Sequence, residues 1–336
     1  MRSRRLAFSQ SGAALLLAML IMTLVTTLAA GMVWQQWRAI QVEAAERGRT
    51  QAAWILVGAL DWARLILRED QRENNRGNPP AADHLGEPWA VPLAEARLSS
   101  FLAADRDNNS VAENDSLDAF LSGSITDAQS RWNLRRLSLN DPSTGKPPAA
   151  AEVKVLARLC AQGGATGDCA DRIAGALGKA WAPAGTGSAA AIAPQQLSQL
   201  SWLGIDADTI KRLEPWVDIL PDVTEVNINT APAEVIAAAV DNMTLGNAQR
   251  LVQDRQRTPI RELNAAATRA YFPVTAPTPV PGISLTSRFF YIQGRLRLEE
   301  RVLEERSLVE RNQNLDVKVR SRERVNLREG IDARTP

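Results

Sequence analysis

The side chains that could do chemistry in this 336-residue chain are few and lie far apart in the sequence. The chain has one histidine, His84, and two cysteines, Cys160 and Cys169. This scarcity excludes a zinc site built from histidine and cysteine ligands. No serine or cysteine motif is placed to use His84 as a general base, so we expect no hydrolase triad. We predict that His84 is a loop residue with a local hydrogen bond and that the chain is not an enzyme.

One acidic stretch offers the oxygen ligands that Ca²⁺ prefers. Its candidate ligands alternate along a polar segment: Asp105, Asp107, Asn109, Glu113 and Asp115. The stretch is not an EF-hand, because Ser110 stands where that loop needs glycine and Ser116 where it needs glutamate. A solvated loop that binds no metal is the alternative interpretation. We expect no required cofactor, with calcium as a candidate ligand of this segment.

The two cysteines are candidates for a disulfide. Eight residues separate Cys160 from Cys169, and a bridge between them would close a small loop worth about 2–3 kcal/mol. Two free thiols are the alternative, which an oxidising compartment disfavours. The spacing is not C-x-x-C, so a redox-active pair is not expected.

Composition limits the class of protein. The chain carries 39 basic and 38 acidic residues, and its formal net charge of +1 gives no overall field that would attract nucleic acid. Hydrophobic residues make up 45% and charged residues 23%, as in an ordinary globular protein. The length suits about two domains.

The N-terminal region predicts a membrane span. Residues 13–36 contain no charged side chain, and a helix of about 20 apolar residues crosses a bilayer core. The basic residues Arg2, Arg4 and Arg5 precede this stretch. By the positive-inside rule they place the N-terminus in the cytoplasm and the rest of the chain outside the inner membrane.

Three interpretations fit this apolar stretch. It could be an uncleaved signal anchor, or a secretory signal cut near Ala29-Ala30-Gly31. The stretch is longer than the apolar region of roughly 7–15 residues in a secretory signal, which counts against the second interpretation. In the third, a short basic leader that ends at Gly12 is removed on the cytoplasmic side and the helix is retained.

The third interpretation carries a resemblance. Gln10-Ser11-Gly12 followed by Ala13–Ala18 resembles the start of type IV pilin-like proteins, and specifically of the type II secretion minor pseudopilin K family. The resemblance implies cleavage by a prepilin peptidase between Gly12 and Ala13 and N-methylation of Ala13. It also marks the fifth mature residue, Leu17, where most pilin-like proteins have glutamate.

The leucine at this position has a physical meaning. A carboxylate in the bilayer costs about 2.5–3.5 kcal/mol on insertion scales. In pilin-like proteins the resemblance implies that the glutamate meets the amine of the neighbouring subunit. A subunit with no neighbour ahead of it gains nothing from that charge, so Leu17 suits the first subunit of a filament. A plain lipid-facing leucine is the alternative.

The pattern beyond the membrane predicts a longer helix. Residues 38–72 contain no proline, and apolar residues recur at three- and four-residue spacing from Ala52 to Leu67. We therefore predict one helix from Ala13 to about Arg72, roughly 85–90 Å long. Segment 74–80 ends it with glycine and prolines.

Other segments also resemble family K. These are Asp83–Ala90, Ser122–Leu134 and Val226–Ile236. The second predicts a hairpin with a polar turn near Asp127. The third resembles the start of helix-hairpin-helix domains, with Thr230 as the N-cap of its helix. Family members bind calcium through acidic residues of the helical domain, but the matching segment here, 178–187, contains no acid.

Helix-hairpin-helix domains often bind DNA, so this segment supports a second hypothesis. A DNA-binding hairpin has a glycine-apolar-glycine turn that presents backbone amides to phosphates. Here the turn has only Gly246, and Asp241 would repel phosphate. The basic residues Arg250, Arg255 and Arg257 could contact DNA or form a solvated surface. A protein-contact module is the interpretation we favour.

The C-terminal third predicts antiparallel strands. Residues 289–298 alternate between two faces, a second run covers 302–309, and a third covers 315–320. Arg297 and Glu310 are candidates for a cross-strand pair. Residues 321–336 are expected to be a frayed tail.

The sequence thus predicts an α+β pilin-like fold, with a long N-terminal transmembrane helix packed on an antiparallel sheet and an inserted, mostly α-helical domain with a helix-hairpin-helix-like motif. The expected parts are a leader (1–12), the transmembrane helix (13–36), the first part of the pilin-like domain (37–140), the inserted helical domain (141–280), the C-terminal strands (281–320) and a tail (321–336).

The resemblance implies a function without chemistry. It implies a minor pseudopilin of the type II secretion system that caps the periplasmic pseudopilus with minor pseudopilins I and J, and H beside them, and supports export of folded proteins across the outer membrane. The major pseudopilin and the prepilin peptidase are further expected partners, and no nucleic acid is expected. The chain would be a single-pass inner-membrane protein with its C-terminal domain in the periplasm. The alternative is a membrane-anchored helix-hairpin-helix DNA-binding protein of a DNA-uptake apparatus.

Overall fold

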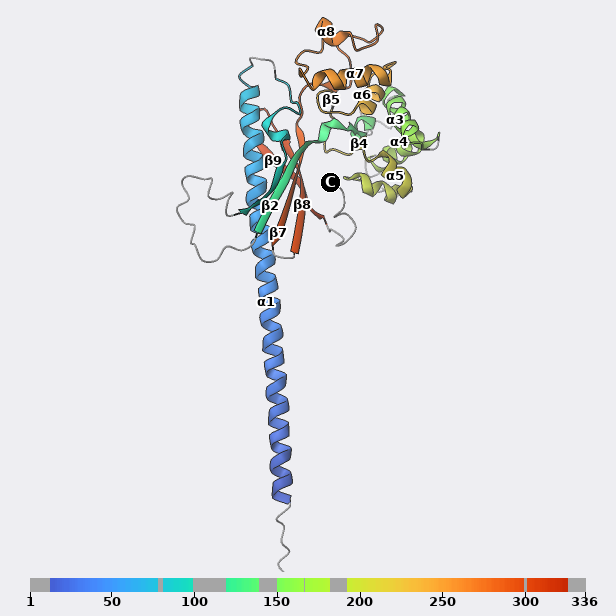
Figure 1. Cartoon of the computed structure of the whole chain (residues 1–336). Coiled ribbons are helices and arrows are strands. Elements are labelled where there is room, and N and C mark those ends of the chain that lie inside the picture. Colours follow the sequence, from blue (N-terminus) through green and yellow to red (C-terminus); the bar gives the residue numbers. More distant parts are fainter. Residues whose placement is uncertain are drawn as a thin grey trace, which may run out of the picture. The chain divides into compact units, whose positions relative to one another are not determined.

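The computed structural model describes residues 13–77, 81–98, 119–138, 150–165, 167–181, 192–298 and 301–325 (Figure 1). The chain divides into two compact units, residues 1–55 and residues 56–336. Helix α1 runs from Ala13 to Asn74 as one continuous helix of 62 residues. The chain turns out of α1 through Gly77, whose φ of +70° suits glycine because it has no Cβ.

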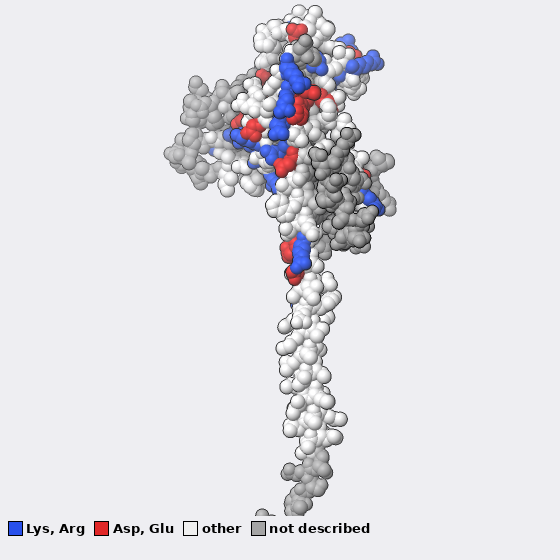
Figure 2. All heavy atoms as spheres, turned by 90° about the vertical axis from the view of Figure 1, so that its left-hand side faces the viewer, with Lys and Arg blue, Asp and Glu red and all other residues white. Residues whose placement is uncertain are grey.

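The part of α1 in the first unit has the composition of a membrane span. Residues 13–36 carry no charged side chain, and the helix is long and apolar enough to cross a bilayer. Figure 2 shows this length of helix without basic or acidic side chains. The rings of Trp34 and Trp37 lie 5.7 Å apart where this stretch ends, a position that suits an interfacial aromatic anchor.

The second unit is built on a five-stranded antiparallel sheet in the order β1-β2-β7-β8-β9. The strands are β1 (Leu93–Arg97), β2 (Ala119–Asp127), β7 (Phe289–Leu298), β8 (Arg301–Arg311) and β9 (Val317–Val325). Two of these strands precede the inserted helices in the sequence and three follow them. The sheet is therefore completed only when distant parts of the chain meet.

Helix α1 covers one face of this sheet. Leu60, Ala63 and Leu67 lie on one side of the helix because they are three and four residues apart. They pack on alternate strand residues: Ile125, Phe290, Ile292, Val309 and Val317. Trp89, from the short 3₁₀ helix η1 (Pro88–Ala90), meets Phe290 edge to face at 5.2 Å. Apolar burial of this kind, at about 25 cal/mol per Å², holds α1 to the sheet.

The chain between β2 and β7 is mostly helical. Its helices are α3 (Ala150–Gln162), α4 (Cys169–Ala180), α5 (Ala207–Leu213), α6 (Ala233–Ala239), α7 (Leu245–Arg255) and α8 (Ala266–Arg269). Short 3₁₀ helices lie at η2 (Ala128–Ser130), η3 (Leu134–Ser138) and η5 (Leu197–Leu203). The helices share an apolar core that includes Leu156, Leu159, Ile173, Leu177, Val235 and Ile236. The predicted α+β pilin-like fold is confirmed.

Two short parallel pairs connect this helical region to the sheet strands. β3 (Trp132–Asn133) pairs with β4 (Val217–Asp218), and β5 (Val226–Asn227) pairs with β6 (Ile283–Ser284). The predicted hairpin at 122–134 is therefore wrong. The chain turns at η2 as expected, but Trp132–Asn133 pairs with β4 rather than folding back on β2.

Two other local predictions are also corrected by the structure. The sheet continues to Val325, so the first five residues of the predicted tail belong to β9. Arg297 lies opposite Val302 and donates to the Glu95 carboxylate at 2.8 Å, whereas Glu310 accepts from Arg320. Register explains the second error, because a pairing chosen from sequence alone can slip along the strand.

The two cysteines form a disulfide that joins the end of α3 to the start of α4, with Cα atoms 6.2 Å apart. Both cysteine side chains lie in the core of the helical region.

We expect the Cys160→Ala/Cys169→Ala double variant to lose about 2–3 kcal/mol of unfolding free energy, because the unfolded chain regains loop entropy. Denaturant unfolding with and without reductant measures this loss. Reductant should lower the stability of the native protein and leave that of the double variant unchanged. Equal stability of the two proteins without reductant would contradict the prediction.

Candidate functional site: a buried polar junction

The segments that resemble family K meet in one buried polar cluster of the second unit. Asp83 and Glu87 come from the loop before η1, Asp127 from the end of β2, and Asn227 from β5. We call these residues, together with Asp70, Thr230, Ser287 and Arg311, the polar junction. They come from α1, the sheet strands and the helical region, so the cluster connects all three.

Asn227 and Asp127 form the part of the junction nearest the helical region. Asn227 is fully buried, and its side-chain amide donates to the carbonyl oxygen of Asp83, the carboxylate of Asp127 and the hydroxyl of Ser287 at 3.0–3.1 Å. The same Asp127 oxygen accepts from the hydroxyls of Ser287 at 2.6 Å and Thr230 at 2.5 Å. These bonds link β2 directly to the segment that follows β5.

The role of Thr230 differs from the predicted one. The N-cap of α6 is Pro232, and no side chain caps that end. Thr230 instead uses its hydroxyl to donate to Asp127, 103 residues away in the sequence. The residue type that suits an N-cap also suits a buried donor, and local sequence does not distinguish the two uses.

Arg311, at the end of β8, supplies the positive charge of the junction. Its side chain is 1% exposed and donates to both carboxylate oxygens of Asp83, at 2.6 and 2.7 Å. It also donates to the Asp70 carboxylate and, at 3.0 Å, to the Ser287 carbonyl oxygen. Asp83 is itself fully buried, so removing either Asp83 or Arg311 would leave the other charge buried without a counter-ion.

Glu87 and His84 complete the outer side of the junction. One Glu87 carboxylate oxygen accepts from the backbone N–H of His84 at 2.9 Å and from the indole N–H of Trp89 at 2.7 Å. His84 uses Nδ1 to accept the backbone N–H of Gly86 at 3.2 Å. Burial and the nearby Arg261 guanidinium lower the pKa of His84. The expectation of a loop histidine with a local hydrogen bond is confirmed.

Burial dominates the electrostatics of the junction carboxyls. It raises the pKa of Asp70 to about 6 and that of Asp127 to about 6. It raises the pKa of Glu87 to about 7, with the neighbouring Asp70 charge adding to the effect. These carboxyls therefore titrate near neutrality, and the folded protein retains protons there that the unfolded chain releases.

The junction does not fit a divalent cation. Asp70, Asp83 and Glu87 form, within the described ranges, a group whose carboxylate oxygens lie within 4.8 Å of one another. Arg311 already occupies the space between two of them and provides their counter-charge. A metal ion would have to displace a fully buried guanidinium, so the cluster is an ion-pair network rather than a metal centre.

Two further asparagines hold the helical region in place through backbone contacts. Asn133 donates to the Asp222 carbonyl oxygen at 2.7 Å and accepts the N–H of Leu220 at 3.1 Å. Asn229 forms a paired contact with the backbone of Ile260, donating at 2.8 Å and accepting at 2.9 Å. Buried polar side chains with all bonds satisfied specify one arrangement of the segments that they join.

We predict that Glu87→Gln makes folding less sensitive to pH. The carboxyl has a higher pKa in the folded state than in the unfolded chain, so the folded state binds more protons and loses stability as the pH rises from about 5 to 8. Glutamine can accept the same two N–H bonds and needs no proton. The unfolding free energy of Glu87→Gln minus that of the native protein should therefore increase with pH, by at most about 1.4 kcal/mol per pH unit.

Denaturant unfolding of both proteins at several pH values tests this difference. Titrating groups far from Glu87 are common to the two proteins and cancel in the comparison, whereas Asp70, whose charge acts on Glu87, contributes to the measured difference. Glu95→Gln is the matched control, because Glu95 is exposed and its partner Arg297 lies on the sheet surface. A difference that stays constant between pH 5 and 8 would contradict a buried, proton-binding Glu87.

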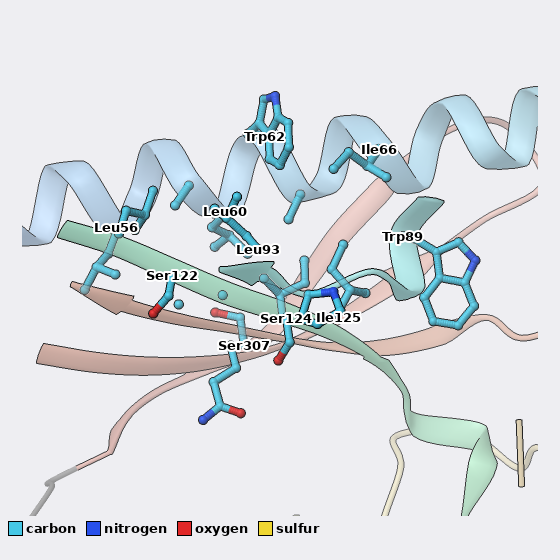
Figure 3. Close-up of a pocket in the computed structure, with 18 of the residues that line it drawn as sticks. Leu56, Leu60, Trp62, Ile66, Trp89, Leu93, Ser122, Ser124, Ile125 and Ser307 are labelled. Carbon is cyan, nitrogen blue, oxygen red and sulfur yellow. The ribbon is translucent and has the colours of Figure 1, made fainter. Parts of the chain in front are cut away.

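A separate apolar cavity of about 270 Å³ lies between α1 and strands β1 and β2. Figure 3 shows Leu56 and Leu60 of α1 above Leu93, Ser122 and Ile125 of the strands. Trp62 and Trp89 are among the other lining residues. The acid in the lining, Glu305, is paired with Arg322. The cavity therefore suits an apolar group and has no acid–base pair for chemistry.

The sequence-predicted residues are not brought together in one site. Gly12 and the calcium candidates Asp105, Asp107, Asn109, Glu113 and Asp115 lie outside the described residues. Ala13 and Leu17 lie in the first unit, where the Leu17 side chain is exposed. The structure instead brings together Asp70, Ser287 and Arg311, whose roles sequence reasoning missed. A weak signal was available, since Arg311 lies two residues after Val309 and alternate strand residues share one face of a sheet.

The arginines of the DNA-binding hypothesis do not form one surface. Arg255 is buried and donates to the Ile228 carbonyl oxygen inside the domain. Arg250 and Arg257 remain exposed, and Arg250 donates to Asn247 of its own helix. Arg255 is therefore withdrawn from the outer surface that a duplex would contact.

Comparison with known proteins identifies the relatives of this chain. The profile of the family described as type II secretion system (T2SS), protein K, matches residues 226–281. Type II secretion system protein K of Pectobacterium carotovorum is 28% identical over 92% of this chain and 93% of its own length. The protein K of Pseudomonas aeruginosa is 27% identical over 74% of this chain and 73% of its own.

A solved structure has the same fold. It is a chain of the GspK-GspI-GspJ complex from the enterotoxigenic Escherichia coli type 2 secretion system. The match has a TM-score of 0.58 at 19% identity and covers 84% of this chain and 98% of that one. The segment matched by the family profile contains Asn227 and Thr230 of the polar junction and the neighbouring Asn229. The sequence-based resemblance is confirmed.

Proposed function

We propose that this chain is a minor pseudopilin, because it shares the fold of a chain from a type II secretion pseudopilin complex and matches type II secretion protein K of three bacteria over 73–93% of their lengths. The observation that carries the proposal is the similarity to the Pectobacterium protein, which extends over 92% of this chain. In this role the protein assembles with minor pseudopilins I and J, with H and the major pseudopilin as further partners. It caps the periplasmic pseudopilus and supports export of folded proteins across the outer membrane.

The apolar helix of the first unit supports a membrane-anchored role. The uncharged helix 13–36 anchors the chain in the inner membrane, and the positive charges before it keep the N-terminus cytoplasmic. Prepilin peptidase cuts between Gly12 and Ala13, and Ala13 becomes the methylated N-terminus. Leu17 avoids a buried carboxylate that has no partner ahead of it, as the first subunit of a filament requires.

The second unit supports a non-enzymatic role in the periplasm. Its most buried charged groups, Asp83 and Arg311, are committed to each other and hold the segments together. The helical region between β2 and β7 adds bulk that would prevent another subunit from adding above. No cofactor is required for such a role, and calcium bound by the segment around Asp105–Asp115 would serve stability rather than chemistry.

Deleting the gene in its native host tests the function. We expect exported proteins to disappear from the medium and to accumulate folded in the periplasm, because transport across the inner membrane does not use the pseudopilus. A plasmid copy of the native gene should restore export. Normal export by the deletion strain would refute the proposed function.

A further inference from the structure

Arg255, the last residue of α7, is a buried cation without a carboxylate partner among the described residues. Its side chain is 9% exposed, and it donates one hydrogen bond, to the Ile228 carbonyl oxygen. The other buried arginines face acids: Arg136 pairs with Glu152, and Arg311 pairs with Asp70 and Asp83. Buried charges in folded proteins are normally paired, so Arg255 is an exception that calls for an explanation.

The effect on the guanidinium itself is consistent with a missing counter-ion. Burial lowers the pKa of Arg255 to about 10, and no acidic neighbour opposes that effect. At Arg311, by contrast, the charges of Asp83 and Asp70 raise the pKa although burial acts in the opposite direction. An anion placed beside Arg255 would therefore gain an interaction that the protein does not otherwise use.

A cavity lies beside Arg255 with room for such an anion. It has a volume of about 650 Å³ and is lined by α7, α8 and the segment 257–262. Arg255 is part of this lining, and none of its nitrogens is both fully enclosed and unpartnered. A donor of Arg255 that is not bonded to Ile228 is therefore reachable by solvent, and the cavity that Arg255 lines lies next to it.

The lining shows which kind of anion fits. Leu251, Pro259 and Ile260 provide an apolar wall. The lining also contains three arginines, at positions 255, 257 and 261, and two acids, at positions 254 and 262. One of these acids, Asp254, accepts from the Tyr271 hydroxyl at 2.6 Å. The two acids disfavour a polyanion such as a nucleic-acid backbone, whereas the single buried guanidinium of Arg255 matches one carboxylate.

We propose that this cavity binds the carboxylate side chain of an aspartate or glutamate presented by a protein partner. The two oxygens of that carboxylate accept from the free N–H donors of Arg255, and the aliphatic part of the side chain lies along the apolar wall. The pairing gives Arg255 the counter-ion that its own chain does not supply. The proposal does not depend on which secretion or assembly role the protein has.

Nuclear magnetic resonance on the full-length chain in detergent micelles, with ¹⁵N-labelled arginine, tests the site. The Nε–Hε signal of Arg255 is assigned by its loss in Arg255→Lys. The probe is N-acetylglutamate amide, and its neutral isostere, N-acetylglutamine amide, is the control ligand. We expect the signal to shift saturably with the first probe, with a Kd on the order of 1–10 mM for a single charge-assisted contact. We expect no saturable shift with the second.

Two variants separate the site from the rest of the surface. Arg250→Met removes an exposed arginine of the same helix that lies outside the lining, and binding should be unchanged, as followed by the Arg255 signal. Arg255→Lys should bind the probe about tenfold more weakly, as measured by calorimetry, because an ammonium cannot donate in the paired geometry. Absence of a saturable shift in the native protein would overturn the proposal. So would tighter binding of inorganic phosphate than of N-acetylglutamate amide.

Discussion

Replacing Arg311 by methionine is expected to lower the unfolding free energy by about 3–5 kcal/mol, because it leaves a buried carboxylate without its cation. Asp83 is fully buried and receives two hydrogen bonds from this guanidinium. Asp70 loses its partner as well, although its raised pKa allows it to take up a proton near pH 6. Denaturant unfolding at pH 7.5 measures the loss.

A matched control is available directly before the neighbouring strand, β7. Arg288 is half exposed, and its ion pairs with Asp222 at 3.1 Å and with Glu310 at 4.0 Å leave it in contact with solvent. Arg288→Met should cost no more than about 1 kcal/mol. The double variant Arg311→Met/Asp83→Asn should recover part of the stability, because it removes the stranded charge. If Arg311→Met proved no more harmful than Arg288→Met, the polar junction would not be the connection that we describe.

Replacing Gly12 by aspartate is expected to abolish maturation of the chain. Glycine leaves the backbone at the cleavage site accessible, whereas aspartate adds a side chain and a charge at the membrane edge. Intact mass spectrometry should show the native protein without its first 12 residues and the variant with them retained. Export in the host should fail with the variant, since an unprocessed subunit keeps its basic leader in the cytoplasm.

A second variant distinguishes the competing interpretation of the N-terminus. A secretory signal would be cut near Ala29-Ala30-Gly31 and would release the chain from the membrane. Ala30→Leu blocks that cut and should leave the N-terminus of the mature chain at Ala13 and the export activity unchanged. A native protein that begins at Met1 or near Met32 would contradict the cleavage site proposed here.

The elements that could be predicted from the sequence are those with strong local periodicity. The apolar stretch of α1 predicts a helix and the alternating residues of β7 predict a strand, because one face of each must be buried or lie in lipid. The motif around Asn227 was also recognisable, but only as a resemblance. Its physical role depends on Asp83 and Asp127, which approach it from other parts of the chain.

The polar junction could not be predicted for the same reason. Its central ion pair joins Asp83 to Arg311, which are 228 residues apart in the sequence. The partner of each group depends on the sheet order β1-β2-β7-β8-β9, in which β2 and β7 are neighbours although the helical region separates them in the sequence. The errors at Thr230 and at Arg297 have this origin too, since each side chain bonds to a partner that is distant in sequence.

The measurement that tests the assembly role most directly is purification of the mature full-length chain with pseudopilins I and J of the same organism in detergent. Size-exclusion chromatography with light scattering should give a single complex that contains all three proteins. A duplex DNA titration over a range of salt concentrations, run on the same sample, should show no tight binding. A chain that elutes alone in the presence of both proteins and binds DNA with a steep salt dependence would contradict the account.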